Sequence, residues 1–140
     1  MRDIKFRAWD NLEKRMRKVV SLHWRDGKLI SARLEGENEP IPIEGRLAIE
    51  QITGMKDENG NEIFVNDIVE MHYFEQYAGP GEVEKTILGV VGKDSMGCFT
   101  EVGNKKYYWL HYLEDAEYYG DTEYNEELEL LGNIHENPEL

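Results

Sequence analysis

Apolar and polar residues alternate along much of this chain, and apolar positions spaced at helical intervals are rare. Short alternating runs are typical of half-buried β-strands. Residues 4–9 and 16–22 alternate in this way, and the polar residues 10–14 between them favour a turn. We therefore predict that the chain begins with a β-hairpin.

The same pattern continues to the end of the chain, with Gly, Asn and Pro residues between the runs. Residues 47–52 form a run too short to decide between a helix and a strand. Residues 76–81 predict a flexible loop, and residues 114–127 predict a loop with room for one helical turn. The remaining runs predict strands at residues 23–24, 28–30, 68–74, 83–91, 98–102, 106–112 and 128–134.

Many short strands at this spacing favour a mainly β fold, either barrel-like or built from SH3-like subdomains. An α+β fold with one short helix is the alternative. The length of 140 residues fits one domain spanning residues 1–140. Two β subdomains within it are the finer hypothesis: residues 1–50 together with the closing C-terminal segment, and residues 51–112.

Two turn signals lie close together in residues 51–69. Asp57, Asn59 and Gly60 predict a tight hairpin turn, because Asn and Gly tolerate a positive φ angle. Asn66 and Asp67 predict a second turn, in which the Asp67 carboxylate accepts hydrogen bonds from backbone N–H groups. We expect these five residues to have structural roles.

The first of these turns also has the spacing that opens an EF-hand calcium loop, with oxygen-bearing side chains at Asp57, Asn59 and Asn61. An EF-hand needs Gly at its sixth position and Glu at its twelfth. Those positions hold Glu62 and Ile68. A hairpin turn explains the same residues, so no metal site is predicted here.

The formal net charge of −13 is divided unevenly. Residues 1–34 hold ten Lys/Arg and four Asp/Glu, whereas residues 111–140 hold ten Asp/Glu and no Lys/Arg. The simplest interpretation is that the two ends partly neutralise each other, within the fold or across a homo-oligomer. The alternatives are that basic residues 14–18 bind nucleic acid, or that the acidic end imitates it and occupies a host DNA-binding protein.

The sequence carries no motif for catalysis, cofactor binding or metal binding. Its four histidines are dispersed, and its carboxylates are too numerous to nominate an acid/base pair. The single cysteine, Cys98, excludes a disulfide framework within the chain and a cysteine-based zinc site. No apolar run is long enough to span a bilayer, so we expect a cytoplasmic protein without a membrane partner.

Residues 107–112 offer the one candidate interaction surface. If they form an alternating strand, Tyr107, Trp109 and His111 share one face of it. A packed face of the core is the simpler interpretation, and an aromatic binding surface is the functional one.

Three segments together resemble the YopX family of phage and prophage proteins. They are KFRAWD at residues 5–10, ITGMKDENGNEIFVNDIV at residues 52–69 and LLGNIHENPEL at residues 130–140. The segments lie in the family's order and span nearly the whole chain. The chain has Asn66 where the family usually has Gly, and Asn is the next most tolerant residue of left-handed geometry.

The resemblance implies a mostly β, barrel-like protein of phage or prophage origin in a bacterial host, with no established activity, cofactor or catalytic set. We therefore expect a non-enzymatic protein-interaction or regulatory module whose partner is a host or phage protein. A nucleic-acid-linked role is the alternative.

Overall fold

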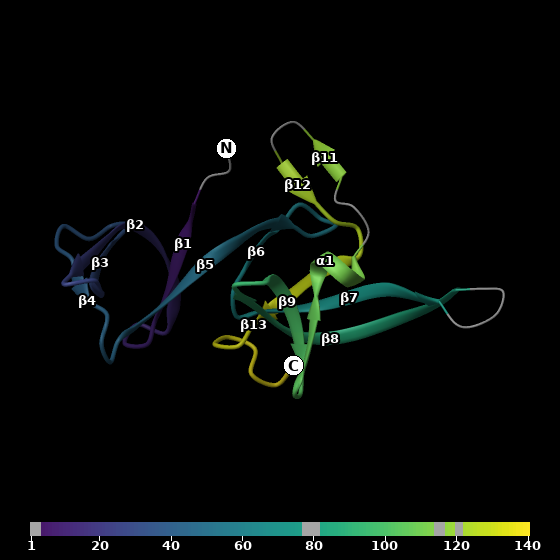
Figure 1. Cartoon of the computed structure of the whole chain (residues 1–140). Helices are drawn as coiled ribbons and strands as arrows, with labels where there is room; N and C mark the ends of the chain where they lie inside the picture. The colour runs from purple at the N-terminus through teal and green to yellow at the C-terminus, as the bar shows by residue number, and fades with distance from the viewer. Residues whose placement is uncertain (1–3, 77–81, 114–116, 120–121) are drawn as a thin grey trace. The chain divides into compact units, whose positions relative to one another are not determined.

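The computed structural model describes residues 4–76, 82–113, 117–119 and 122–140. Strands make up most of this part of the chain, and a single short helix accompanies them (Figure 1). The mainly β prediction is confirmed. Two sheets contain almost exclusively antiparallel strands, and neither closes into a barrel within the described residues.

The chain divides into two compact units, at residues 3–52 and 53–140. This boundary lies close to the one predicted between the two subdomains. The assignment of the closing C-terminal segment to the first subdomain was wrong, because strand β13 (Leu128–Asn133) pairs with β7 (Asp67–Gln76) in the second unit.

In the N-terminal unit the first four strands form a meander, and the fifth returns to pair with the first. Strand β1 pairs with β2 on one side and with β5 on the other, and β2 continues through β3 to β4. The bounds are β1 Phe6–Asp10, β2 Arg15–Arg25, β3 Lys28–Leu34, β4 Ile41–Pro42 and β5 Leu47–Lys56. Its core contains Ala8, Ala32, Leu34, Ile41 and Leu47.

Residues 47–52, left open by the sequence, belong to strand β5. Five of these residues, from Leu47 to Gln51, pair with β1, and this pairing explains the result. The cross-strand bonds decide a conformation that so short a run cannot specify. The last residues of β5 lie in the C-terminal unit, where β5 also pairs with β6 (Glu62–Phe64).

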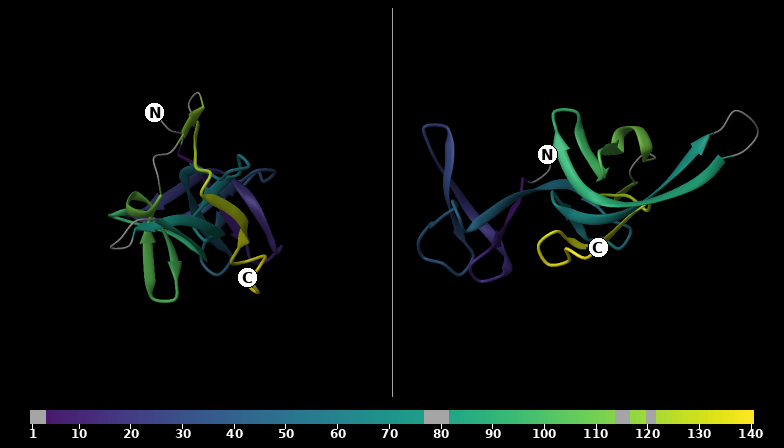
Figure 2. Two further views of the ribbon diagram at one scale, coloured as in Figure 1. Left: turned by 90° about the vertical axis from the view of Figure 1, so that its right-hand side faces the viewer. Right: turned by 90° about the horizontal axis from the view of Figure 1, so that it is seen from below.

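The C-terminal unit contains a five-stranded antiparallel sheet in the order β10-β9-β8-β7-β13. Its longest elements, β7 and β8, run side by side as a hairpin, and β8 bends along its length (Figures 1 and 2). The further bounds are β8 Glu82–Asp94, β9 Gly97–Val102, β10 Lys105–Tyr108, α1 Trp109–Tyr112, β11 Glu117–Tyr119 and β12 Thr122–Tyr124. Its core contains Ile63, Val69, Met71, Tyr73, Val91, Trp109 and Leu128.

Two sequence predictions fail next to this core. The strand predicted at residues 106–112 ends at Tyr108, and residues 109–112 form helix α1 instead. Part of the loop predicted at residues 114–127 is the antiparallel hairpin β11–β12. The loop predicted at residues 76–81 lies outside the described residues, except for Gln76 at the end of β7.

Candidate functional site

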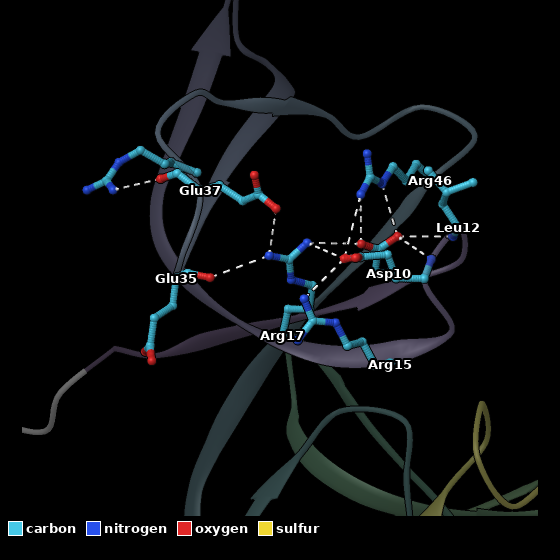
Figure 3. Close-up of polar contacts among 9 residues, drawn as sticks. Asp10, Leu12, Arg15, Arg17, Glu35, Glu37 and Arg46 are labelled. Carbon is cyan, nitrogen blue, oxygen red and sulfur yellow. Dashed lines mark hydrogen bonds and ion pairs between the residues drawn. The ribbon is translucent and has the colours of Figure 1, made fainter.

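The most polar part of the N-terminal unit is built around Asp10, at the end of β1. Its carboxylate is fully buried and accepts backbone hydrogen bonds from Leu12 and Glu13 at 3.0 and 3.2 Å. Arg46 donates to both carboxylate oxygens, from Nε at 3.0 Å and from Nη2 at 2.9 Å (Figure 3). This two-point geometry is the strongest arrangement between an arginine and a carboxylate.

A second arginine, Arg17 on β2, completes the cluster. Its guanidinium group is buried and points toward Asp10, as Figure 3 shows. It lies 3.2 Å from the Asp10 carboxylate, 2.7 Å from that of Glu13 and 2.9 Å from that of Glu37. Arg17 therefore joins the β1–β2 turn to the loop that follows β3.

The contacts in this cluster shift the pKa values of its members. The hydrogen bond from Arg46 lowers the pKa of Asp10 well below its usual range, and the turn N–H groups and Arg17 add to that effect. The bond to Glu37 raises the pKa of Arg17, and the bond to Asp10 raises that of Arg46. All three groups stay charged at neutral pH, so the cluster is a set of permanent ion pairs rather than a proton donor.

This cluster was not predicted from the sequence. Nucleic-acid binding by the basic residues 14–18 was one alternative there, whereas Arg17 is committed to carboxylates inside the unit. An Asp at the start of a polar turn was the local signal for Asp10. No local signal identifies Arg46, which lies 36 residues away from its partner.

The first predicted turn is held by Asp57, which is fully buried. One carboxylate oxygen accepts the backbone N–H groups of Asn59 and Asn61 at 3.0 and 2.8 Å, and the other accepts the side-chain amide of Asn61 at 3.3 Å. The second oxygen also accepts the backbone N–H of Leu130 on β13 at 2.8 Å. Gly60 has a φ angle of 83°. Asp57 thus connects the turn to a strand from the far end of the chain.

The second predicted turn leads into β7. Asn66 has a φ angle of 74°, in the left-handed region that its residue type tolerates. The buried carboxylate of Asp67 accepts the backbone N–H of Phe64 at 2.7 Å. Asp67 therefore closes this turn from inside.

The C-terminal motif forms a third turn of the same kind. The Asn133 side chain accepts the backbone N–H groups of His135 and Glu136, and the Asn137 side chain accepts the backbone N–H of Asn133. Gly132 leaves room for Asn137, because a Cβ atom there meets the Asn137 side chain. All three segments that carried the resemblance therefore contain Asp or Asn residues that fix turns.

The candidate surface of Tyr107, Trp109 and His111 is not a single strand face. Tyr107 lies on β10, while helix α1 turns Trp109 into the core, where its Nε1 donates to Thr100 Oγ1 at 2.9 Å. His111 is exposed on α1. The helical turn also brings Tyr112 against Tyr107, with ring centroids 5.1 Å apart. Burial of Trp109 outweighs the alternating pattern, so the shared-face prediction was wrong.

The face of the C-terminal sheet opposite its core carries a second polar group. His72 contacts the carboxylates of Glu70 at 3.2 Å and Glu84 at 3.5 Å, and Thr86 lies 3.0 Å from its Nδ1. Among the described residues, no group of three or more His, Cys, Asp or Glu side chains is placed to hold a metal ion. Burial raises the pKa of the Cys98 thiol, which disfavours the reactive thiolate.

Two comparisons with known proteins give matches over nearly the whole chain. No curated protein matches it. The chain is similar to the crystal structure of protein EF1440 from Enterococcus faecalis, with a TM-score of 0.62 and 26% sequence identity over 99% of this chain and 98% of that one. In the part of the chain that the structure describes, no helix has the length and apolarity needed to cross a membrane. The model of the YopX protein family matches residues 5–140, and the chain belongs to that family.

Proposed function

We propose that this member of the YopX family is a non-enzymatic protein-interaction module, which acts in the cytoplasm of a bacterial host and binds a host or phage protein. The observation that carries this proposal is an exposed tryptophan at the end of the β2–β3 hairpin. Trp24 is 58% exposed, although tryptophan is usually largely buried.

The surroundings of Trp24 suit a binding hot spot. Trp24 pairs across the hairpin with Leu29, and Ile30 beside it is 36% exposed. Trp is among the residue types that contribute most often to binding energy at protein interfaces. The hairpin end therefore offers an exposed apolar anchor.

The buried polar residues support a binding role over a catalytic one. Asp10 is held by arginines and turn N–H groups, and Asp57 by turn and strand N–H groups. Carboxylates committed in this way maintain the fold and do not face a substrate. The same commitments favour a rigid module that presents its hairpin in one conformation.

Site-specific crosslinking from position 24 tests the proposal in the bacterial host. We expect a photoreactive residue in place of Trp24 to give one discrete protein adduct, and Trp24→Ala to prevent copurification of that same protein. Met96→Ala is the matched control, because Met96 is 63% exposed in a turn of the C-terminal unit. Absence of a reproducible adduct together with substrate turnover by the purified chain would overturn the proposal.

A nucleic-acid-linked role is the second candidate, and the charge of the C-terminal unit favours its mimicry version. Residues 53–140 hold five Lys/Arg and twenty Asp/Glu. In that version the chain binds a host DNA-binding protein, and duplex DNA releases it. Salt-sensitive binding of the chain itself to DNA would support the direct version instead.

A further inference from the structure

The outer face of the β2–β3 hairpin is cationic. Ser21 pairs with Arg33, His23 with Ser31, and Arg25 with Lys28, so these six side chains share one face. Lys18 lies on the same face, because its neighbour Val19 packs into the core. We call Lys18, Arg25, Lys28 and Arg33 the cationic face. Among the described residues, no carboxylate pairs with Lys18, Arg25 or Lys28.

The outer face of the C-terminal sheet has the opposite charge. Glu129 lies directly across from Glu70, Phe74 from Glu84, and Val90 from Glu101. These pairs alternate with core positions such as Met71 and Val91, so they lie on the side away from the core. We call Glu70, Glu84, Glu101 and Glu129 the carboxylate face.

The carboxylate face holds more acidic than basic side chains. Besides its four carboxylates it holds His72, which contacts Glu70 and Glu84, and Lys106, which lies directly across from Glu101. Like charges directly opposite each other on neighbouring strands destabilise a sheet, and Glu70 faces Glu129 in this way. Glu84 has a side chain that is 59% exposed, and Phe74 and Leu88 on the same face are 50% and 42% exposed. An incoming group with positive charge and an apolar stem is the complement of this surface.

We infer that the carboxylate face of one molecule binds the cationic face of a second copy. The two faces carry four residues each and opposite charge, and the Lys and Arg stems cover Phe74 and Leu88. The contact joins unlike faces, so it either closes as a reciprocal pair or ring, or repeats from one molecule to the next. The two-stranded hairpin is narrow, so the association is reversible and depends on salt.

The charge distribution favours a second copy over nucleic acid as the occupant. The C-terminal unit carries fifteen more acidic than basic residues, and this excess repels a phosphate backbone. The same excess attracts the cationic face of another molecule. The inference does not rest on the proposed function, because Trp24 is absent from both faces.

A charge-swap experiment by analytical ultracentrifugation tests the inference on the full chain. At about 20 mM salt the average mass of the wild type rises with concentration above that of the monomer, and at about 500 mM salt it falls to that of the monomer. Arg25→Glu with Lys28→Glu reverses one face, and Glu84→Lys with Glu129→Lys reverses the other. Each reversed variant alone associates at least about tenfold more weakly than the wild type.

An equimolar mixture of the two reversed variants associates again, because each supplies the face that matches the other. Two controls change the net charge by the same amount elsewhere: Lys14→Glu with Lys105→Glu, and Glu58→Lys with Glu126→Lys. Each control keeps both faces, so it self-associates to the extent that its changed net charge allows. Mixing a control with a reversed variant does not raise the association above that of the control alone. If a reversed variant does not fold, a neutral variant of the same face replaces it: Arg25→Gln with Lys28→Gln, or Glu84→Gln with Glu129→Gln. We expect these neutral variants to lose less association than the reversed ones.

Three outcomes would overturn the inference. They are a wild type that stays monomeric at low salt, a mixture that does not recover association, and controls that lose association as strongly as the reversed variants. Binding of duplex DNA by a chain that stays monomeric would assign the cationic face to nucleic acid instead. Trp24→Ala leaves self-association unchanged, so failure of this inference and failure of the proposed function are distinguishable.

Discussion

At the scale of single residues, buried Asp and Asn side chains replace regular backbone pairing at the turns. Asp10, Asp57 and Asn133 each accept at least two backbone N–H groups that the turn leaves without a strand partner. A buried N–H group without an acceptor costs about 1–3 kcal/mol. These side chains therefore determine where each turn sits, in a fold that has many turns and small cores.

Replacement of Asp57 tests this role most directly. Asp57→Ala leaves the N–H groups of Asn59, Asn61 and Leu130 without their acceptor, so we expect the free energy of unfolding to fall by about 3 kcal/mol. Urea denaturation measures the change. Glu58→Ala is the control, because Glu58 is exposed in the same turn. Equal midpoints for Asp57→Ala and the wild type would contradict the structural role.

Asp10 makes stability depend on pH in a defined direction. Arg46 lowers the folded-state pKa of Asp10, so the stabilisation is complete above the unfolded-state pKa of about 4 and is lost as pH falls below it. We expect Asp10→Asn to cost about 3 kcal/mol at neutral pH, because Arg17 and Arg46 lose a buried charged partner. Denaturation midpoints at descending pH measure the gap between variant and wild type.

The difference in denaturation midpoint between wild type and Asp10→Asn narrows progressively below about pH 4. There the wild type loses the stabilisation from the Asp10 carboxylate that the variant already lacks. A gap that stays constant down to about pH 2 would mean that Asp10 does not titrate with folding. Glu44→Gln provides a control, because Glu44 is an exposed carboxylate two residues from Arg46.

Residue type alone indicates local geometry, but it cannot identify a distant partner. Asn66 and Gly60 have the positive φ angles for which these residue types stand out in the sequence. By contrast, Leu130 lies 73 residues from Asp57, and Arg46 lies 36 residues from Asp10. Such partners depend on which strands become neighbours, and the alternating pattern carries no information about strand order.

At the scale of elements, close packing across strands fixes the β8–β9 hairpin. The Phe99 ring lies over Gly92, which faces it directly across the two strands. Tyr108 packs against Phe99 with ring centroids 5.4 Å apart, and its hydroxyl donates to Asp94 at 2.7 Å. This bond raises the pKa of Tyr108 and lowers that of Asp94. Gly92 supplies the space on which the arrangement depends.

A methyl group at position 92 should disrupt this packing. A Cβ atom there meets the Phe99 ring, so we expect Gly92→Ala to destabilise the chain by about 1–3 kcal/mol. Thermal or urea denaturation measures the loss. In the Phe99→Ala background the same substitution has less effect, because the obstructing ring is absent. Equal losses of stability in the wild-type and Phe99→Ala backgrounds would mean that the cost of Gly92→Ala does not come from the Phe99 ring.

Element type was predictable where alternation and turn residues agree, as in the β2–β3 hairpin, for which strands were predicted at residues 23–24 and 28–30. The prediction failed at α1, because the pattern of residues 107–112 predicts a strand as far as Tyr112, whereas the strand ends at Tyr108. From this helical turn the Trp109 side chain reaches Thr100 and the core. Tertiary packing decided this element, and a six-residue pattern cannot reveal it.

At the scale of the whole molecule, each unit contains its own apolar core. Leu34 is fully buried in the N-terminal core, and Leu128 is fully buried in the C-terminal core. Strand β5 is continuous through the boundary, because it pairs with β1 before residue 52 and reaches Lys56 in the next unit. Separate cores predict separate local stabilities, with β5 as the segment that responds to both.

Hydrogen exchange of two core variants tests this division. Leu34→Ala removes buried methyl groups from the N-terminal core at a cost of about 2–5 kcal/mol, so amide exchange should accelerate in residues 4–52 and stay unchanged in β7 and β8. Leu128→Ala should give the reverse pattern, with β1 and β2 unchanged. Peptides from β5 should accelerate in both variants, because that strand belongs to both units. Acceleration throughout the chain in either variant would instead make the two units one cooperative structure, in which neither core is stable without the other.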